Sequence, residues 1–189
     1  MASVGNLTAA ATLTGAAVSC TVLAGALRAP DGSMTLFAWH PTLMIASVSM
    51  FAPSAMCVAA MRKESSASRK QSLGTAHAVL HAGAVGCAVA AAAAIYSNKA
   101  ANGKPHLTSI HSGLGAGALA AVIGSAALQV AGPSDWQALA TKAAFAMATV
   151  ALASGIGHPN WTPPGLSAVE RIQVGLGIVA APLAALLLF

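Results

Sequence analysis

Charged side chains are scarce in this sequence of 189 residues, which has nine Lys and Arg, four Asp and Glu, and 7% charged residues in all. Soluble domains average about 25% charged residues, so the composition excludes an ordinary soluble globular protein. Hydrophobic residues make up 57% of the chain, which favours helices that contact a lipid bilayer. The few basic residues predict short loops at a membrane surface rather than a surface that binds nucleic acid.

Aromatic residues (4%) and cysteines (three) are also few. Cys20, Cys57 and Cys87 each lie in an apolar stretch without a CxxC pair, so neither a zinc site nor a disulfide framework is predicted. Acidic residues that could couple a transporter to protons or cations are absent from the apolar stretches. The 18 glycines indicate helices that pack closely through small side chains.

The charges divide the chain into six uncharged windows, each long enough for one membrane span of about 20 residues. The windows predict six transmembrane helices, at Leu7–Leu27, Thr35–Met61, Leu73–Ser97, Leu107–Ala131, Trp136–Ile156 and Ala168–Phe189. We therefore expect a single all-α, multi-pass integral membrane domain over residues 1–189. The polar loop 62–71 carries four Lys and Arg, which predicts that it lies on the cytoplasmic side together with the N-terminus.

Histidines recur at similar depths in three successive windows. His40 follows Asp31 by nine residues, and His77 and His111 each follow a lysine by seven. Because successive helices alternate in direction, His40 and His111 share one side of the membrane and His77 lies on the other. Two facing imidazoles in a helix bundle can ligate a haem iron, whereas a single intramembrane histidine can simply bond a neighbouring helix.

The remaining histidines fit this pattern less well. His81 lies one turn from His77 on the same helix face, so the two cannot both be axial ligands of one haem. His106 and His158 fall at predicted helix ends, where solvated loop residues are expected.

Three segments resemble the cytochrome b561 family, in the correct order over about residues 35–120. The segment Leu36–Met44 (LFAWHPTLM) resembles the start of the family's second helix, and His77–His81 (HAVLH), after the basic loop, resembles the start of its third. The segment Pro105–Gly115 (PHLTSIHSGLG) is similar to the start of its fourth.

The resemblance implies a six-helix bundle in which helices 2–5 form the core and hold two haems b. Such proteins transfer electrons across a membrane, from ascorbate to monodehydroascorbate or ferric iron. The resemblance assigns one haem to His40 and His111. It assigns the cytoplasmic haem to His77 and a histidine early in helix 5. Arg69, Lys70 and His106 are the candidate residues for an anionic reductant or substrate.

The sequence departs from the family pattern in helix 5, because no histidine lies between His111 and His158. Counting seven residues from Asp135, the spacing that separates His77 and His111 from their preceding lysines, gives Lys142 instead. Methionine can ligate haem iron, but the spacing of Met147 does not favour it as a ligand. One haem b is therefore expected, and His77 lacks a partner for a second.

Two functions stay open at this point. The first is a haem-binding electron-transfer protein, an oxidoreductase of the ascorbate or ferric reductase type. The second is a structural subunit of a larger respiratory or photosynthetic complex, with reduced or no haem content. Either protein would lie in the bilayer, as a homodimer or as one subunit of a larger membrane complex, in an intracellular or organellar membrane.

Overall fold

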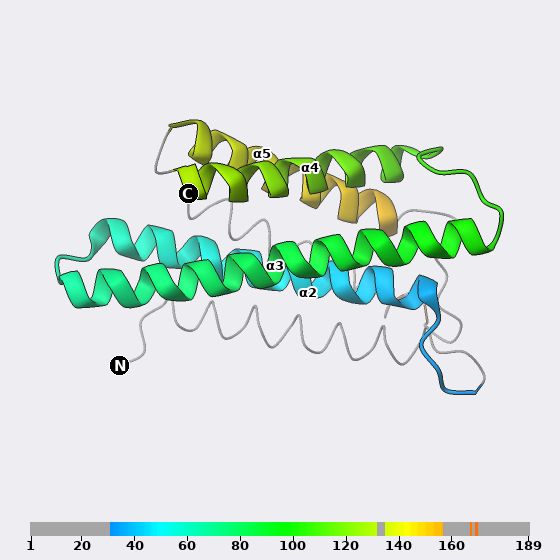
Figure 1. Ribbon diagram of the computed structural model, residues 1–189, viewed down its shortest axis with the longest axis horizontal. Coiled ribbons are helices and arrows are strands. Elements are labelled where there is room, and N and C mark those ends of the chain that lie inside the picture. Colours follow the sequence, from blue (N-terminus) through cyan, green and yellow to red (C-terminus); the bar gives the residue numbers. More distant parts are fainter. Residues whose placement is uncertain (1–30, 132–134, 157–166, 168, 170–189) are drawn as a thin grey trace.

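The computed structural model describes residues 31–131, 135–156, 167 and 169. The predicted helices at 7–27 and 168–189 and the loop around His158 lie outside these residues, apart from positions 167 and 169, so the count of six helices stays a prediction. Four helices run side by side along the long axis (Figure 1): α2 (Leu36–Lys63), α3 (Ala67–Ala101), α4 (Ile110–Ala131) and α5 (Asp135–Ile156). The all-α architecture is confirmed for the part of the chain that the structure describes.

The helices form two antiparallel hairpins. α2 packs along α3 and α4 packs along α5, whereas α3 and α4 touch more sparsely. The start of α2 and the connection from α3 to α4 lie at one end of the molecule, and the turn from α2 to α3 lies at the other (Figure 1). His40 and His111 therefore lie near one end and His77 nearer the other, which agrees with their predicted membrane sides.

A buried apolar cluster joins the two hairpins. Its members come from all four helices and are mostly small, with two phenylalanines among them: Phe51, Ala55, Ala84, Val122, Ala144 and Phe145. The rings of Phe51 on α2 and Phe145 on α5 meet edge to face, with centroids 5.5 Å apart. Small residues on α3 and α4 let the helices approach this aromatic pair, as the composition predicted.

The predicted loop over 62–71 is mostly helical, which corrects the expected boundaries of the second and third helices. α2 continues to Lys63 and α3 begins at Ala67, so only Glu64–Ser66 form the turn. The Glu64 carboxylate accepts hydrogen bonds from the backbone N–H groups of Ser65 and Ser66, each 2.9 Å long. Polar residues end a membrane span without ending a helix, because the backbone bonds of the helix continue into the headgroup region.

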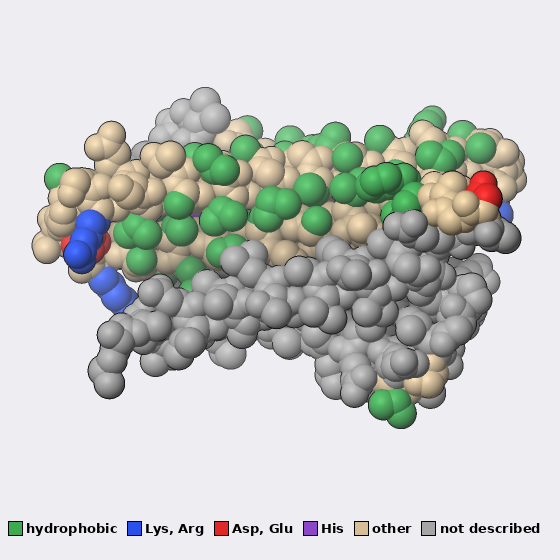
Figure 2. Space-filling model, turned by 90° about the horizontal axis from the view of Figure 1, so that it is seen from below, with side chains coloured by type: hydrophobic (Ala, Val, Ile, Leu, Met, Phe, Trp, Pro, Cys, Tyr) green, Lys and Arg blue, Asp and Glu red, His purple; other side chains and the backbone are tan. Residues whose placement is uncertain are grey.

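The outer surface suits a bilayer. Among the described residues, α2, α3 and most of α4 are long and apolar enough to cross a membrane, and α5 contains a shorter apolar segment, Leu139–Leu152. On the face in Figure 2, hydrophobic side chains spread along the described helices, and charged side chains gather at the two ends. The chain is an integral membrane protein whose apolar helices contact lipid.

Candidate functional site

His40 lies in the second turn of α2, and its ring reaches across to α3. Thr35 caps the helix by accepting a hydrogen bond from the N–H of Ala38, 3.1 Å away. The imidazole Nδ1 lies 3.0 Å from the carbonyl oxygen of Ala91, which is fully buried. A carbonyl can only accept, so Nδ1 carries the proton and donates it.

His111 makes the corresponding contact in the second hairpin. It lies in the first turn of α4, and its Nδ1 is 2.9 Å from the carbonyl oxygen of Ala151 on α5. The Ser154 hydroxyl lies 3.3 Å from the same nitrogen and donates to the same carbonyl. Gly155 makes this approach possible, because a Cβ there would lie 2.8 Å from Cε1 of the histidine ring.

The rings of His40 and His111 meet edge to face between the two hairpins. The centroids of His40 and His111 are 6.3 Å apart, and the ring planes cross at 81°. In each ring the carbonyl contact places a proton on Nδ1, so that the electron pair of the neutral form lies on Nε2. The arrangement offers two imidazoles, one from each hairpin, that could hold a metal centre between them.

His77 lies on α3 and bonds the other helix of its hairpin, α2. Its Nδ1 lies 2.8 Å from the hydroxyl oxygen of Ser54 and 3.1 Å from the carbonyl oxygen of the same residue. The ring also lies 5.6 Å from that of His81, centroid to centroid. His77 therefore bonds a serine hydroxyl and a backbone carbonyl of the neighbouring helix.

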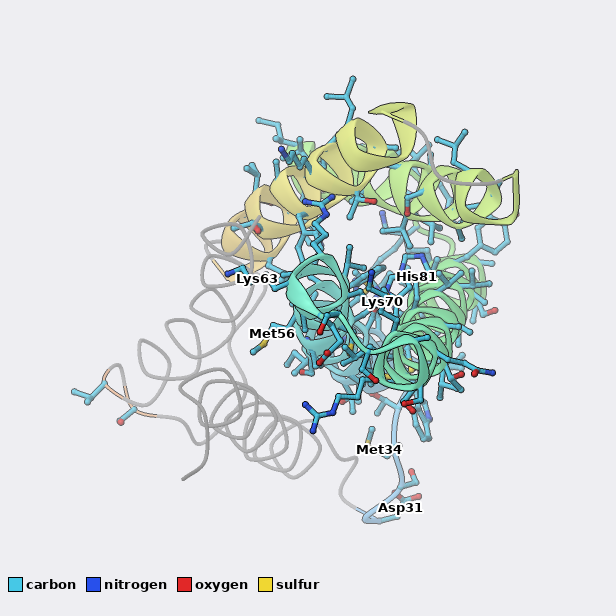
Figure 3. The ribbon with its side chains drawn as sticks, turned by 90° about the vertical axis from the view of Figure 1, so that its left-hand side faces the viewer. Asp31, Met34, Met56, Lys63, Lys70 and His81 are labelled. Atoms are coloured by element: carbon cyan, nitrogen blue, oxygen red, sulfur yellow. The ribbon has the colours of Figure 1, made fainter. Side chains whose placement is uncertain are left out.

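Aromatic side chains pack beside His77 and His81. His81 is buried on the inner side of α3, where Figure 3 shows it in an end view of the bundle. Its ring meets that of Phe51 edge to face, with centroids 5.2 Å apart, and Phe51 in turn contacts Phe145 of α5. At this level α2, α3 and α5 are in direct side-chain contact.

Lys142 does not occupy an inward ligand position. It is exposed and shares the outer face of α5 with the exposed residues Leu139, Ala146 and Val150. The inner face of this helix carries buried Ala144 and Phe145. A seven-residue offset from the helix start therefore selects a residue on the wrong face of α5. Met147 packs against α4, where its methyl group contacts the backbone at Gly117.

The three candidate substrate residues lie at opposite ends of the molecule. Arg69 and Lys70 are exposed in the first turn of α3, and Arg69 Nη1 lies 3.7 Å from the Glu64 carboxylate. His106 lies in the α3–α4 connection, at the end that holds His40 and His111, where its ring stacks on Tyr96 with centroids 4.3 Å apart. The sequence reading missed Tyr96, the one tyrosine of the chain.

Fold and site together define a membrane-embedded helical bundle that pairs histidines from two hairpins. The family model for eukaryotic cytochrome b561 matches residues 39–132, which include most of α2 and all of α3 and α4. The chain belongs to the cytochrome b561 family, whose members generally bind haem b. α5 lies beyond the matched residues. Neither a search of curated proteins nor one of solved structures returns a match.

Proposed function

We propose that this protein binds one haem b between His40 and His111 and transfers electrons on that side of the membrane. The observation that carries the proposal is the close approach of two imidazoles from separate hairpins, each with Nδ1 bound to a backbone carbonyl. Bound haem would supply one-electron chemistry between ferric and ferrous iron. The chain's own residues would hold the iron, fix the ring tautomers and exclude water.

The spacing of the two rings fits axial ligation. Ring centres of two imidazoles on one metal ion lie about 6 Å apart, because each metal–nitrogen bond is about 2 Å long and each ring radius is about 1 Å. The centroids of His40 and His111 are 6.3 Å apart. Hydrogen bonds from Nδ1 to a carbonyl orient a ligating histidine and raise its basicity. Both features support ligation by this pair.

A second haem has weaker support in this chain. His77 would need an inward-facing ligand on α5, and the described inner face there carries Ala144 and Phe145. The edge-to-face contact of Phe51 with Phe145 already joins α2 to α5 beside His81. We therefore assign His77 a structural role through its bonds to Ser54.

The redox partner of a single haem would bind at the same end of the bundle. The stacked rings of His106 and Tyr96 lie there. So do two cations, Lys99 in the last turn of α3 and Lys104 in the connection. Lys104 is exposed, and Lys99 donates a hydrogen bond to the carbonyl oxygen of Pro105, 3.2 Å away. This positive surface favours an anionic small molecule such as ascorbate. Arg69 and Lys70, at the other end, set the membrane orientation in this proposal.

Haem content of the purified protein tests the ligand assignment. We expect a b-type absorption spectrum from the native chain and its loss in His40→Ala and in His111→Ala. The matched control is His106→Ala, which removes an exposed histidine at the same end and should leave the haem content unchanged. Full haem content in both ligand variants would contradict the assignment. A native chain without haem would favour the structural subunit instead.

A further inference from the structure

Three side chains on α2 make hydrogen bonds to α3, at three evenly spaced levels along the two helices. His40 bonds Ala91, Ser47 bonds Ala84 and Ser54 bonds His77, the last through both the ring nitrogen and the backbone carbonyl oxygen. Each level lies seven residues further along α2 and seven residues further back along α3. We call these three contacts the α2–α3 ladder.

Seven residues make almost two helical turns, so the ladder stays on one face of each helix. Its levels are about 10 Å apart along the helix axis and span about 21 Å in all. Ser47 and Ser54 are 2% and 1% exposed, and the Ser47 hydroxyl lies 2.7 Å from the carbonyl oxygen of Ala84. Ala84 and Ala91 are fully buried, and their small side chains allow the two backbones this close approach.

Such bonds fix how far one helix is displaced along the other. In an apolar interface, sliding α2 along α3 exchanges one methyl contact for another at little cost. When the helices slide, however, each buried hydroxyl loses its acceptor on α3 and can bond only a carbonyl of its own helix, as Ser49 does with Ile45. The bond between the two helices is then lost. The ladder therefore opposes sliding at the levels of Ser47 and Ser54, and the third level is His40 itself.

We propose that Ser47 and Ser54 are positioning residues that set the depth of His40 on α2, so that its ring meets that of His111. The inference rests on the proposed haem site, because His40 and His111 need to lie at the same depth only if they ligate one haem. The serines touch neither the iron nor a substrate in this assignment. They act through the register of α2 against α3.

Ser49 provides a matched control for the haem experiment. It is also a buried serine of α2, but its hydroxyl donates to Ile45 of the same helix, 2.6 Å away. We expect Ser47→Ala to lose haem about threefold faster than the native protein, and Ser47→Ala with Ser54→Ala about tenfold faster, from the average worth of a hydrogen bond between membrane helices. Both should also shift the reduction potential, and Ser49→Ala should change neither quantity.

Disulfide cross-linking measures the register without haem. A Cβ at Gly83 would lie 2.7 Å from Sδ of Met50, so the pair Met50→Cys with Gly83→Cys should cross-link when Cys20, Cys57 and Cys87 are replaced by Ala. We expect the double serine variant to lower the cross-linking yield about threefold or more relative to Ser49→Ala. If the native chain binds no haem, the proposed function fails while this arm still measures the register. Haem loss and potential in Ser47→Ala that match those of Ser49→Ala would overturn the positioning role.

Discussion

The two facing histidines reach their carbonyl partners because the adjoining residues are small. On α3 the acceptor belongs to Ala91, which is fully buried. On α5 the acceptor is Ala151, and Gly155 leaves room for the ring one turn further along. A helix carbonyl that already accepts its own helical bond has a second lone pair for such a contact. At Ala151 the hydroxyl of Ser154 shares that acceptor with His111. The small side chains of Ala91 and Ala151 and the lack of one at Gly155 therefore leave the room that the two imidazole rings need.

Gly155→Ala should weaken haem binding without removing a ligand. The new methyl group would lie 2.8 Å from Cε1 and 3.1 Å from Nδ1 of His111, which is closer than ordinary van der Waals contact, so the ring must move. We expect haem to dissociate about 10-fold faster, the lower end of the usual cost of disturbing a ligand's supporting contacts. Stopped-flow transfer of haem to apomyoglobin measures this rate.

Gly124→Ala is the control for that substitution, since a Cβ at Gly124 meets no atom within 4 Å. It also lies in the same helix as His111, about 20 Å away along the axis. Equal rates of haem loss in the two alanine variants would contradict a role for the space at Gly155.

At the scale of elements, the turn Glu64–Ser66 connects α2 and α3, which both extend beyond their apolar windows. In this turn, hydrogen bonds from the backbone N–H groups of Ser66 and Ser65, together with nearby Arg69, hold the pKa of Glu64 below its usual range. A lowered pKa in the folded state means that the ionised carboxylate stabilises this state. The contribution is complete above the unfolded pKa of about 4.3 and is lost as the pH falls through the lower, folded value.

Glu64→Gln should therefore lower stability at neutral pH more than at acidic pH. We expect its thermal unfolding midpoint to lie below that of the native protein at about pH 7, and the two to converge towards about pH 3. Ser65→Ala is the control, because it changes the same turn without a titratable group. A difference between Glu64→Gln and the native protein that stays constant across this range would contradict the role of the carboxylate.

Much of the four-helix core follows from the sequence, because uncharged windows and turn residues locate membrane spans well. The predicted first residues of α4 and α5 lie within three residues of the observed ones, and the predicted last residues agree with the structure. The paired depth of His40 and His111 also follows from counting. The acceptors at Ala91 and Ala151 do not, because a backbone carbonyl leaves no mark in the sequence. A count from the helix start gives the depth of Lys142 but not the rotation of α5, so its exposed face does not follow from the spacing.

At the scale of the whole molecule, the two hairpins meet differently at their two ends. Near one end the rings of His40 and His111, from separate hairpins, lie 6.3 Å apart between their centroids. Nearer the other, Phe51 and Phe145 close the bundle and His77 bonds Ser54 within its own hairpin. The levels of His40 and Ser54 are 14 residues apart on α2, or about 21 Å. A single haem near His40 would therefore exchange electrons with one side of the bilayer much faster than with the other.

Sealed vesicles can show this asymmetry. With the protein reconstituted in both orientations, an external reductant that does not cross lipid, such as ascorbate, should reduce only the haem whose α3–α4 connection faces outward. The rest should be reduced only after a membrane-permeant mediator is added. The fraction of molecules whose α3–α4 connection faces outward is measured independently in a Lys104→Cys variant, since residue 104 is exposed in that connection. The three native cysteines are replaced by Ala, and an impermeant thiol reagent labels the new cysteine.

The reduced and labelled fractions should agree, and the haem-to-protein ratio should be one. Complete reduction without mediator would show that electrons do cross the bundle. A ratio of two would show a second haem, and a partner ligand to His77 would then have to be sought on α5.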